Sequence, residues 1–293
     1  MKGFGYVVLG LTLLALLSGC TDAAAPVAPP SVKSDPTPQS LPPPPRSPFT
    51  GLPTDLAAPV LAVKIDNVAP ARPQTGITAA DLVYVEPVEG GLTRLLAVFQ
   101  SWIHPVIGPV RSARETDLQL LACLNSPALA YSGEAPELRP LLVGAPMVDV
   151  SMSAVPAAYY RERGRRSPHN LYVRTAALGV GQPPRDIGFR FGPLPVGART
   201  MAHFTAQYRS TSISIDWVAP ERRWVFGVDG APLLATEGGR PGAATVVLQQ
   251  VAVRDTAIRD VAGSPSPFVE SVGTGAAVVL RDGQAIEGTW SRS

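Results

Sequence analysis

The chain has 293 residues, of which 45% are hydrophobic and 16% are charged, and 32 are proline. Its 25 basic and 23 acidic residues leave a net charge of +2, which argues against a nucleic-acid binder that works through bulk positive charge. Two cysteines are too few for a disulfide scaffold or a Cys-rich zinc module.

Residues 1–20 read as a targeting segment. One basic residue, Lys2, precedes an apolar run from Phe4 to Leu17, which is shorter than the ~20 residues that a membrane-spanning helix needs. The sequence Leu17-Ser-Gly-Cys20 resembles a bacterial lipobox, in which the cysteine thiol is acylated. We therefore expect a lipid anchor at Cys20, the lipid bilayer as a partner, and a location on the outer face of the cytoplasmic membrane. The alternative is an ordinary secretory signal peptide with an incidental cysteine.

Residues 21–50 contain ten prolines and almost no large apolar side chain, a composition typical of an extended tether. The alternative is a Pro-rich motif that binds a partner.

With Cys20 acylated, Cys123 has no partner in the chain. Its Leu-rich surroundings favour a buried structural cysteine over a reactive thiol.

Residues 51–200 alternate strand and helix patterns. Strands are expected at 60–65, 81–86, 93–99 and 127–131, and helices at 113–124 and 137–143. The short, glycine-bearing joint between the second and third strands predicts a hairpin. The pattern indicates a mixed α/β N-terminal domain.

Residues 205–293 carry short alternating strands at 213–217, 223–226, 245–253, 278–280 and 285–290. Asp282-Gly283 between the last two is a strong hairpin signal. These strands predict a smaller β-rich C-terminal domain, joined through the Pro- and Gly-rich stretch 179–197. The predicted fold class is thus α+β.

Polar residues are dense between residues 64 and 114, where strands end and loops begin. Backbone N–H groups at a helix start, with arginines beside them, favour an anion site. The candidate ligand-binding residues in this segment are Lys64, Asp66, Asn67, Arg72, Gln74, Glu89, Arg94, Arg111 and Arg114.

These segments also carry a family resemblance. Blocks at 64–67, 71–76, 80–84, 86–94 and 108–114, together with Pro168-His-Asn-Leu-Tyr172 and the tryptophans Trp217 and Trp290, resemble the YerB-like family of bacterial lipoproteins. The resemblance covers nearly all of residues 51–293 and implies a membrane-anchored, two-part protein. Family members continue for one or two further strands, so we expect a truncated C-terminal domain.

Three hypotheses follow. In the first, the N-terminal domain forms a cleft for a phosphate- or carboxylate-bearing envelope component, such as a cell-wall polymer or an anionic lipid. Arginines would grip the anion, Lys64, Asp66 and Glu89 would orient it, and His169 and Asn170 would close the site. In the second, an envelope enzyme acts on a glycopolymer or a lipid-linked phosphate, with Glu89 or Glu86 as the base. In the third, a non-catalytic assembly module has a purely structural charge network.

The sequence offers little support for a bound metal or cofactor. No ligand pair has a diagnostic metal spacing, and no phosphate-binding or dinucleotide-binding loop is present, so we expect no metal and no cofactor. The basic loop Arg161–Arg166 suits anionic lipid headgroups or wall polymers, and equally a solvated surface loop.

Overall fold

A computed structural model describes residues 44–179, 181–260 and 263–293. The predicted signal segment with Cys20, and the predicted tether up to residue 43, lie outside these residues. Residues 44–293 form one compact unit. No helix in the described part of the chain is long and apolar enough to cross a membrane.

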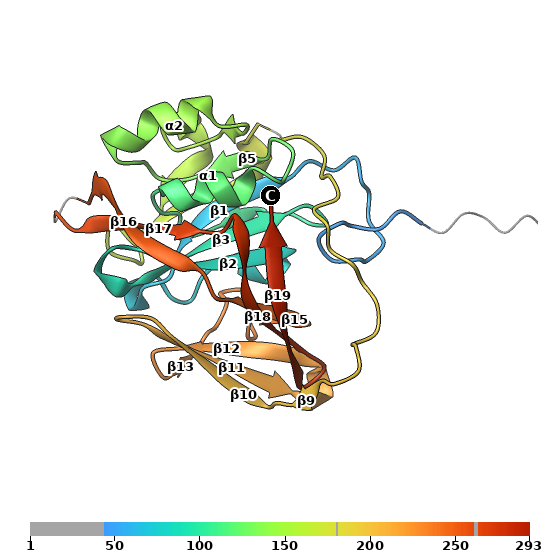
Figure 1. The fold of residues 1–293 in the computed structure, drawn as a ribbon. Helices are drawn as coiled ribbons and strands as arrows, with labels where there is room; N and C mark the ends of the chain where they lie inside the picture. The colour runs from blue at the N-terminus through green and yellow to red at the C-terminus, as the bar shows by residue number, and fades with distance from the viewer. Residues whose placement is uncertain (1–43, 180, 261–262) are drawn as a thin grey trace, which may run out of the picture. The chain divides into compact units, whose positions relative to one another are not determined.

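A five-stranded mixed sheet forms the centre of the N-terminal half (Figure 1). Its order is β2 (Leu82–Pro87), β3 (Thr93–Phe99), β1 (Leu61–Asp66), β5 (Ala128–Ala130) and β6 (Val148–Asp149). The pairs β2–β3 and β1–β3 are antiparallel, whereas β1–β5 and β5–β6 are parallel. Both faces of β1 are buried, which explains why its sequence is almost continuously apolar.

The two faces of this sheet have separate cores. On one face, Val63, Ile65 and Phe99 pack with a three-stranded sheet of β4 (Val106–Ile107), β8 (Leu171–Arg174) and β7 (Tyr159–Arg161). On the other, Leu96 and Val98 pack with α1 (Glu115–Leu121) and α2 (Arg139–Gly144). Side chains alternate along a strand, so each strand feeds both cores.

The C-terminal half contains two further sheets and a separate hairpin. One sheet has the order β10 (His203–Gln207), β11 (Ser212–Val218), β12 (Arg223–Val228) and β13 (Ala231–Pro232), with β14 (Gly242–Ala243) also paired to β12. The other has the order β15 (Thr245–Gln249), β18 (Gly273–Arg281), β19 (Gln284–Arg292) and β9 (Arg199–Thr200). Fully buried Trp224 packs in their shared core.

The hairpin of β16 (Ala252–Arg259) and β17 (Pro265–Glu270) contacts the N-terminal half. Strand β17 lies against α1, β2 and the short 3₁₀ turn at Glu89–Gly91. The backbone N–H of Val269 donates to Thr116 Oγ1 of α1 at 3.1 Å. The β-rich half therefore helps to build the surroundings of the N-terminal polar residues.

The strand predictions at 81–86 and 93–99 are confirmed as the antiparallel β2–β3 pair. The Asp282-Gly283 hairpin is also confirmed, since Arg281 pairs with Gln284 and both turn residues have positive φ, as a type I′ turn requires. The segment expected as one strand at 245–253 is divided, because β15 ends at Gln249 and β16 begins at Ala252.

The expected helix content is too high. The structure is mostly strands with few helices, and the mixed α/β description of the N-terminal half overstates its helical part. The helix expected over 113–124 covers only Glu115–Leu121. Asn125 and Ser126 have positive φ and precede Pro127, so the chain leaves the helical conformation to enter β5.

Candidate functional site

Charged side chains meet at the edge of the central sheet where β1 ends and β3 begins. In the strand register, Arg94 of β3 lies opposite Asp66 of β1 and opposite Glu86 of β2. Strands β1, β5 and β6 run parallel, and their carboxyl ends are where ligands bind in many open sheets. We call six residues here the charged edge: Asp66, Glu89, Arg94, Arg111, Arg114 and His169.

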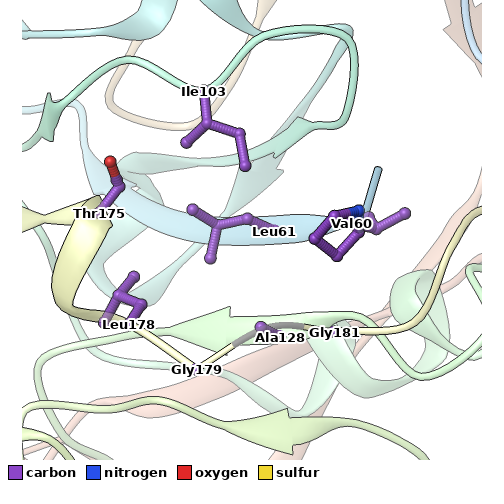
Figure 2. Close-up of a pocket in the computed structure, with 9 residues that line it drawn as sticks. Val60, Leu61, Ile103, Ala128, Thr175, Leu178, Gly179 and Gly181 are labelled. Atoms are coloured by element: carbon purple, nitrogen blue, oxygen red, sulfur yellow. The ribbon is translucent and has the colours of Figure 1, made fainter. Parts of the chain in front are cut away.

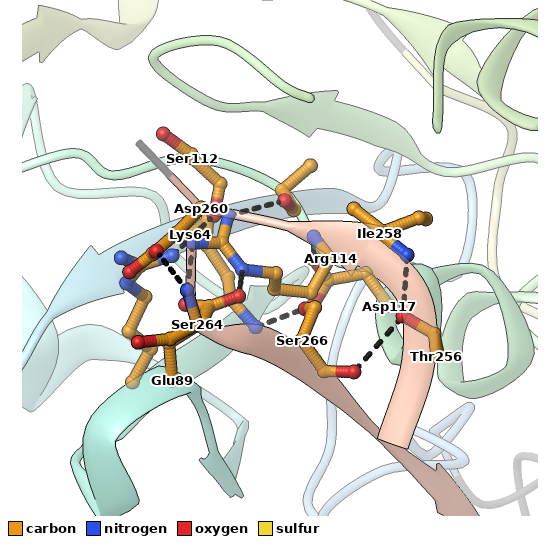
Figure 3. A network of polar contacts seen from close by, with 12 residues as sticks. Lys64, Glu89, Ser112, Arg114, Asp117, Thr256, Ile258, Asp260, Ser264 and Ser266 are labelled. Carbon is orange, nitrogen blue, oxygen red and sulfur yellow. Dashed lines mark hydrogen bonds and ion pairs between the residues drawn. The ribbon is translucent and has the colours of Figure 1, made fainter. Parts of the chain in front are cut away.

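Lys64 belongs to a buried network beside the charged edge. Its side chain is fully buried, and Nζ lies 2.6 Å from Asp117 Oδ1 (Figure 3). Nζ also lies 2.9 Å from Glu86 Oε1. Burial and the neighbouring Asp117 carboxylate raise the pKa of Glu86 to about 8, against the opposing effect of Lys64. Protonated Glu86 leaves one ammonium and one carboxylate, so the network is close to neutral. The ammonium of Lys64 is therefore engaged by buried groups of the protein itself.

Asp117 also fixes the start of α1. It stands at the third position of the helix, and its Oδ2 accepts the backbone N–H of Arg114 at 2.6 Å. This contact satisfies one of the N–H groups that every helix leaves unpaired at its start. Sequence reasoning did not single out Asp117. Its position three residues after a helix start was the available signal.

Glu89 and Arg114 form a two-pronged ion pair. Arg114 Nε lies 2.6 Å from Oε1 and Nη2 lies 2.7 Å from Oε2 of Glu89 (Figure 3). Burial alone would raise the pKa of Glu89, but the hydrogen bonds and the charge of Arg114 lower it to about 2. Glu89 is therefore ionised at neutral pH and engaged by Arg114. Glu86 pairs with Lys64 instead.

Asp66 holds two partners at the partly exposed side of the charged edge. Its Oδ2 lies 2.7 Å from Nδ1 of His169 and 3.2 Å from Nε of Arg111. The Asp66 carboxylate is 2% exposed, whereas both partner side chains are 22% exposed. The segment before β8 thus brings His169 to the end of β1, 103 positions away in the sequence.

Arg94 is the most unusual member of the charged edge. It is 9% exposed, and its one hydrogen bond found among the described residues runs from Nη1 to the carbonyl of Ser112 at a long 3.4 Å. The ion pairs found in the described chain do not include Arg94. Burial, together with the charges of Arg114 and Arg111, lowers the pKa of Arg94 to about 10. The charges of Glu89 and Asp66 oppose this shift, and the charged edge holds three arginines and two carboxylates.

The remaining candidate residues form hydrogen bonds that hold loops in place. Arg72 reaches the C-terminal half, where Nη1 donates to the carbonyl of Val228 at 3.0 Å and Nη2 pairs with Asp229 at 3.1 Å. Gln74 donates to the carbonyl of Asp66 and to Oδ1 of Asn67.

Asn67 and Asn170 have equally local roles. Asn67 Nδ2 donates to Thr93 Oγ1 at 2.8 Å. Asn170 Nδ2 donates to the carbonyls of Glu162 and Arg165, which orders the basic loop. The structure thus brings Asp66, Glu89, Arg94, Arg111, Arg114 and His169 together and assigns Asn67, Arg72, Gln74 and Asn170 to the supporting loops.

Two cavities lie away from the charged edge. One, of about 50 Å³, is lined by Leu61, Ile103, Thr175 and Leu178 (Figure 2). Its volume would accommodate a few water molecules. The other, of about 250 Å³, opens between strands of the C-terminal half beside Phe204, Leu248 and Val278. Within the described residues, no three His, Cys, Asp or Glu side chains gather as metal ligands.

Comparison with known proteins places the chain in a family. A family model described as the N-terminal domain of a protein of unknown function, DUF3048, matches residues 49–187, and its C-terminal counterpart matches residues 203–293. The chain belongs to this two-domain family.

Two Bacillus subtilis comparisons give particular relatives. "Putative lipoprotein YerB" of strain 168 is 34% identical over 132 residues, which are 44% of this chain and 40% of that protein. A crystal structure of the YerB protein from Bacillus subtilis superposes with a TM-score of 0.71 at 21% identity, over 85% of this chain and 87% of that chain. The resemblance seen in the sequence blocks is thereby confirmed, and the structural likeness shows that the two proteins share a fold.

Proposed function

We propose that the protein is an envelope lipoprotein whose charged edge binds an anionic group of an envelope component. The name of the Bacillus relative and the Leu17–Cys20 sequence support the anchor. Acylation of Cys20 would hold the compact unit at the outer face of the cytoplasmic membrane. Replacement of Cys20 with alanine should abolish incorporation of a fatty-acid label and release the protein from membranes. A Cys20→Ala protein that keeps the label would contradict the anchor.

The observation that carries the anion site is the buried side chain of Arg94, for which no ion pair is found in the described chain. A buried charge costs several kcal/mol unless it is paired, so an arginine outside these ion pairs suits a ligand that supplies the negative charge. The charge of Arg111 acts on Arg94. Arg111 uses only Nε toward Asp66, and no hydrogen bond of its Nη groups is found in the described chain. Two adjacent guanidinium groups fit a phosphate or a carboxylate through paired N–H donors.

The test measures binding of inorganic phosphate and of glycerol 3-phosphate to the full chain in detergent by calorimetry. A hydrogen bond to a charged group contributes ~1.5–3 kcal/mol, so Arg94→Gln should weaken binding by about tenfold or more. Arg190→Gln removes the same charge from a side chain that is 77% exposed and should leave the affinity unchanged. Equal affinity of wild type and Arg94→Gln would show that Arg94 does not hold the anion.

A further inference from the structure

The charged edge contains a carboxylate–imidazole pair that the binding proposal does not need. Asp66 Oδ2 lies 2.7 Å from His169 Nδ1. An ionised carboxylate can only accept hydrogen bonds, so the ring hydrogen resides on Nδ1. In the neutral ring with this tautomer, Nε2 keeps its lone pair, which is the form of histidine that removes a proton from another molecule.

A second histidine–aspartate pair in the chain shows what a merely structural pair looks like. His203 Nδ1 lies 2.6 Å from Asp216 Oδ1, but its Nε2 is already occupied by Thr205 Oγ1 at 2.9 Å. Both members of that pair are well exposed. In contrast, Asp66 is buried, His169 is partly exposed, and no hydrogen-bond partner of His169 Nε2 is found among the described residues. The Asp66–His169 pair therefore combines a fixed ring with a nitrogen that is free to meet a reactant.

The residues around the Asp66–His169 pair favour a reaction at a phosphate group. Arg111 shares Asp66 Oδ2 with His169, and the charges of both Arg111 and Asp66 act on Arg94. Positive groups fixed beside a base stabilise the negative charge that accumulates on phosphoryl oxygens during transfer. A base, two guanidinium groups and partial exposure in one place are the components of a hydrolytic site for phosphate esters.

We propose that the charged edge hydrolyses a phosphodiester, with His169 as the catalytic base and Asp66 as its positioning residue. This inference rests on the proposed anion binding. His169 Nε2 accepts a proton from water as the water oxygen bonds to phosphorus. The bond from phosphorus to the leaving oxygen breaks, and its electron pair stays on that oxygen. The imidazolium returns the proton to the leaving oxygen, which gives an alcohol, a phosphate monoester and neutral His169.

The test measures release of p-nitrophenol from bis(p-nitrophenyl) phosphate by the full chain in detergent. General-base catalysis contributes about 10²–10⁴-fold, so His169→Ala should lower kcat at least 100-fold, and added imidazole should restore part of it. Asp66→Asn should lower kcat with little change in KM, because it removes the carboxylate that fixes the ring. His203→Gln is the matched control and should match wild type. Thermal melting checks that each variant is folded.

Two further substrates identify the source of the phosphodiester. Vesicles of phosphatidylglycerol present it in a lipid headgroup, and soluble poly(glycerol phosphate) presents it in a polymer. Hydrolysis of either one, lost in His169→Ala, supports the proposal. Phosphate binding without hydrolysis of any of the three substrates overturns the proposed hydrolysis and leaves the binding function intact. Activity that persists in His169→Ala also overturns it, and absence of both binding and turnover overturns both proposals.

Discussion

Replacement of Lys64 with methionine tests the buried network most directly. The change keeps the length of the side chain but removes the ammonium that lies 2.6 Å from Asp117 and 2.9 Å from Glu86. Removal of one member of a buried ion pair costs ~3–5 kcal/mol, because the remaining charge is left without compensation. In a unit of this size 1 kcal/mol shifts the melting temperature by about 2–4 °C, so the expected loss is about 6–20 °C.

The assay is thermal unfolding followed by circular dichroism. Arg190→Met is the matched control, since Arg190 pairs with Asp186 and the two side chains are 77% and 66% exposed. Exposed ion pairs contribute ~0–1 kcal/mol, so the control should melt within about 4 °C of wild type. If Lys64→Met melts within the same interval as the control, the interpretation of Lys64 as a structural residue is wrong.

Three further predictions concern Glu86, Gly283 and Arg72. The folded-state pKa of Glu86, about 8, lies above its value in the unfolded chain. Between about pH 4.5 and pH 8 the unfolded chain therefore releases a proton that the folded protein keeps, and stability falls as pH rises. Glu86→Gln should gain stability relative to wild type across this interval, and a constant difference in melting temperature between about pH 5 and pH 8 would contradict this. Gly283→Ala should lower the urea midpoint, because Gly283 has a φ of 71° and an added Cβ would lie 2.8 Å from Trp217 Nε1. Gly288→Ala is the control, because a Cβ added at Gly288 meets nothing within 4 Å. Arg72→Ala should cost about 1–2 kcal/mol in urea unfolding through the lost contacts with Val228 and Asp229, and an unchanged midpoint would show that this tie is not stabilising.

The sequence predicts the strands of the central sheet well because their signals are local. Residues 93–99 form a continuous apolar run apart from Thr93 and Arg94, and they become β3 with the expected bounds. Asp282-Gly283 likewise specifies its turn through backbone conformation alone. The length of α1 was overestimated because apolar residues continue past Leu121, although the backbone at Asn125 and Ser126 has already left the helix.

The roles of the charged residues were harder to predict, because they depend on partners far away in the sequence. Lys64 stands at a strand end beside Asp66, and both were assigned to a ligand site. Lys64 and Asp66 are two positions apart and so share one face of β1, and the contact of Lys64 with Asp117 of α1, 53 positions later, depends on how α1 packs on that face. The role of β17 beside Glu89–Gly91 also requires the tertiary fold, because no local pattern in 265–270 specifies what the strand covers.

The contacts between the two halves have a consequence for how the compact unit comes apart. Glu237 accepts the backbone N–H of Gly76 and the hydroxyl of Thr78, and Arg292 donates to carbonyls of Gln119 and Leu120. These partners are separated by about 160 to 173 positions in the sequence. The contacts between them therefore form late in folding, after distant segments of the chain have come together. A chain nicked by a protease in the connection before β9 would therefore stay assembled, and its two fragments would unfold together in a single transition.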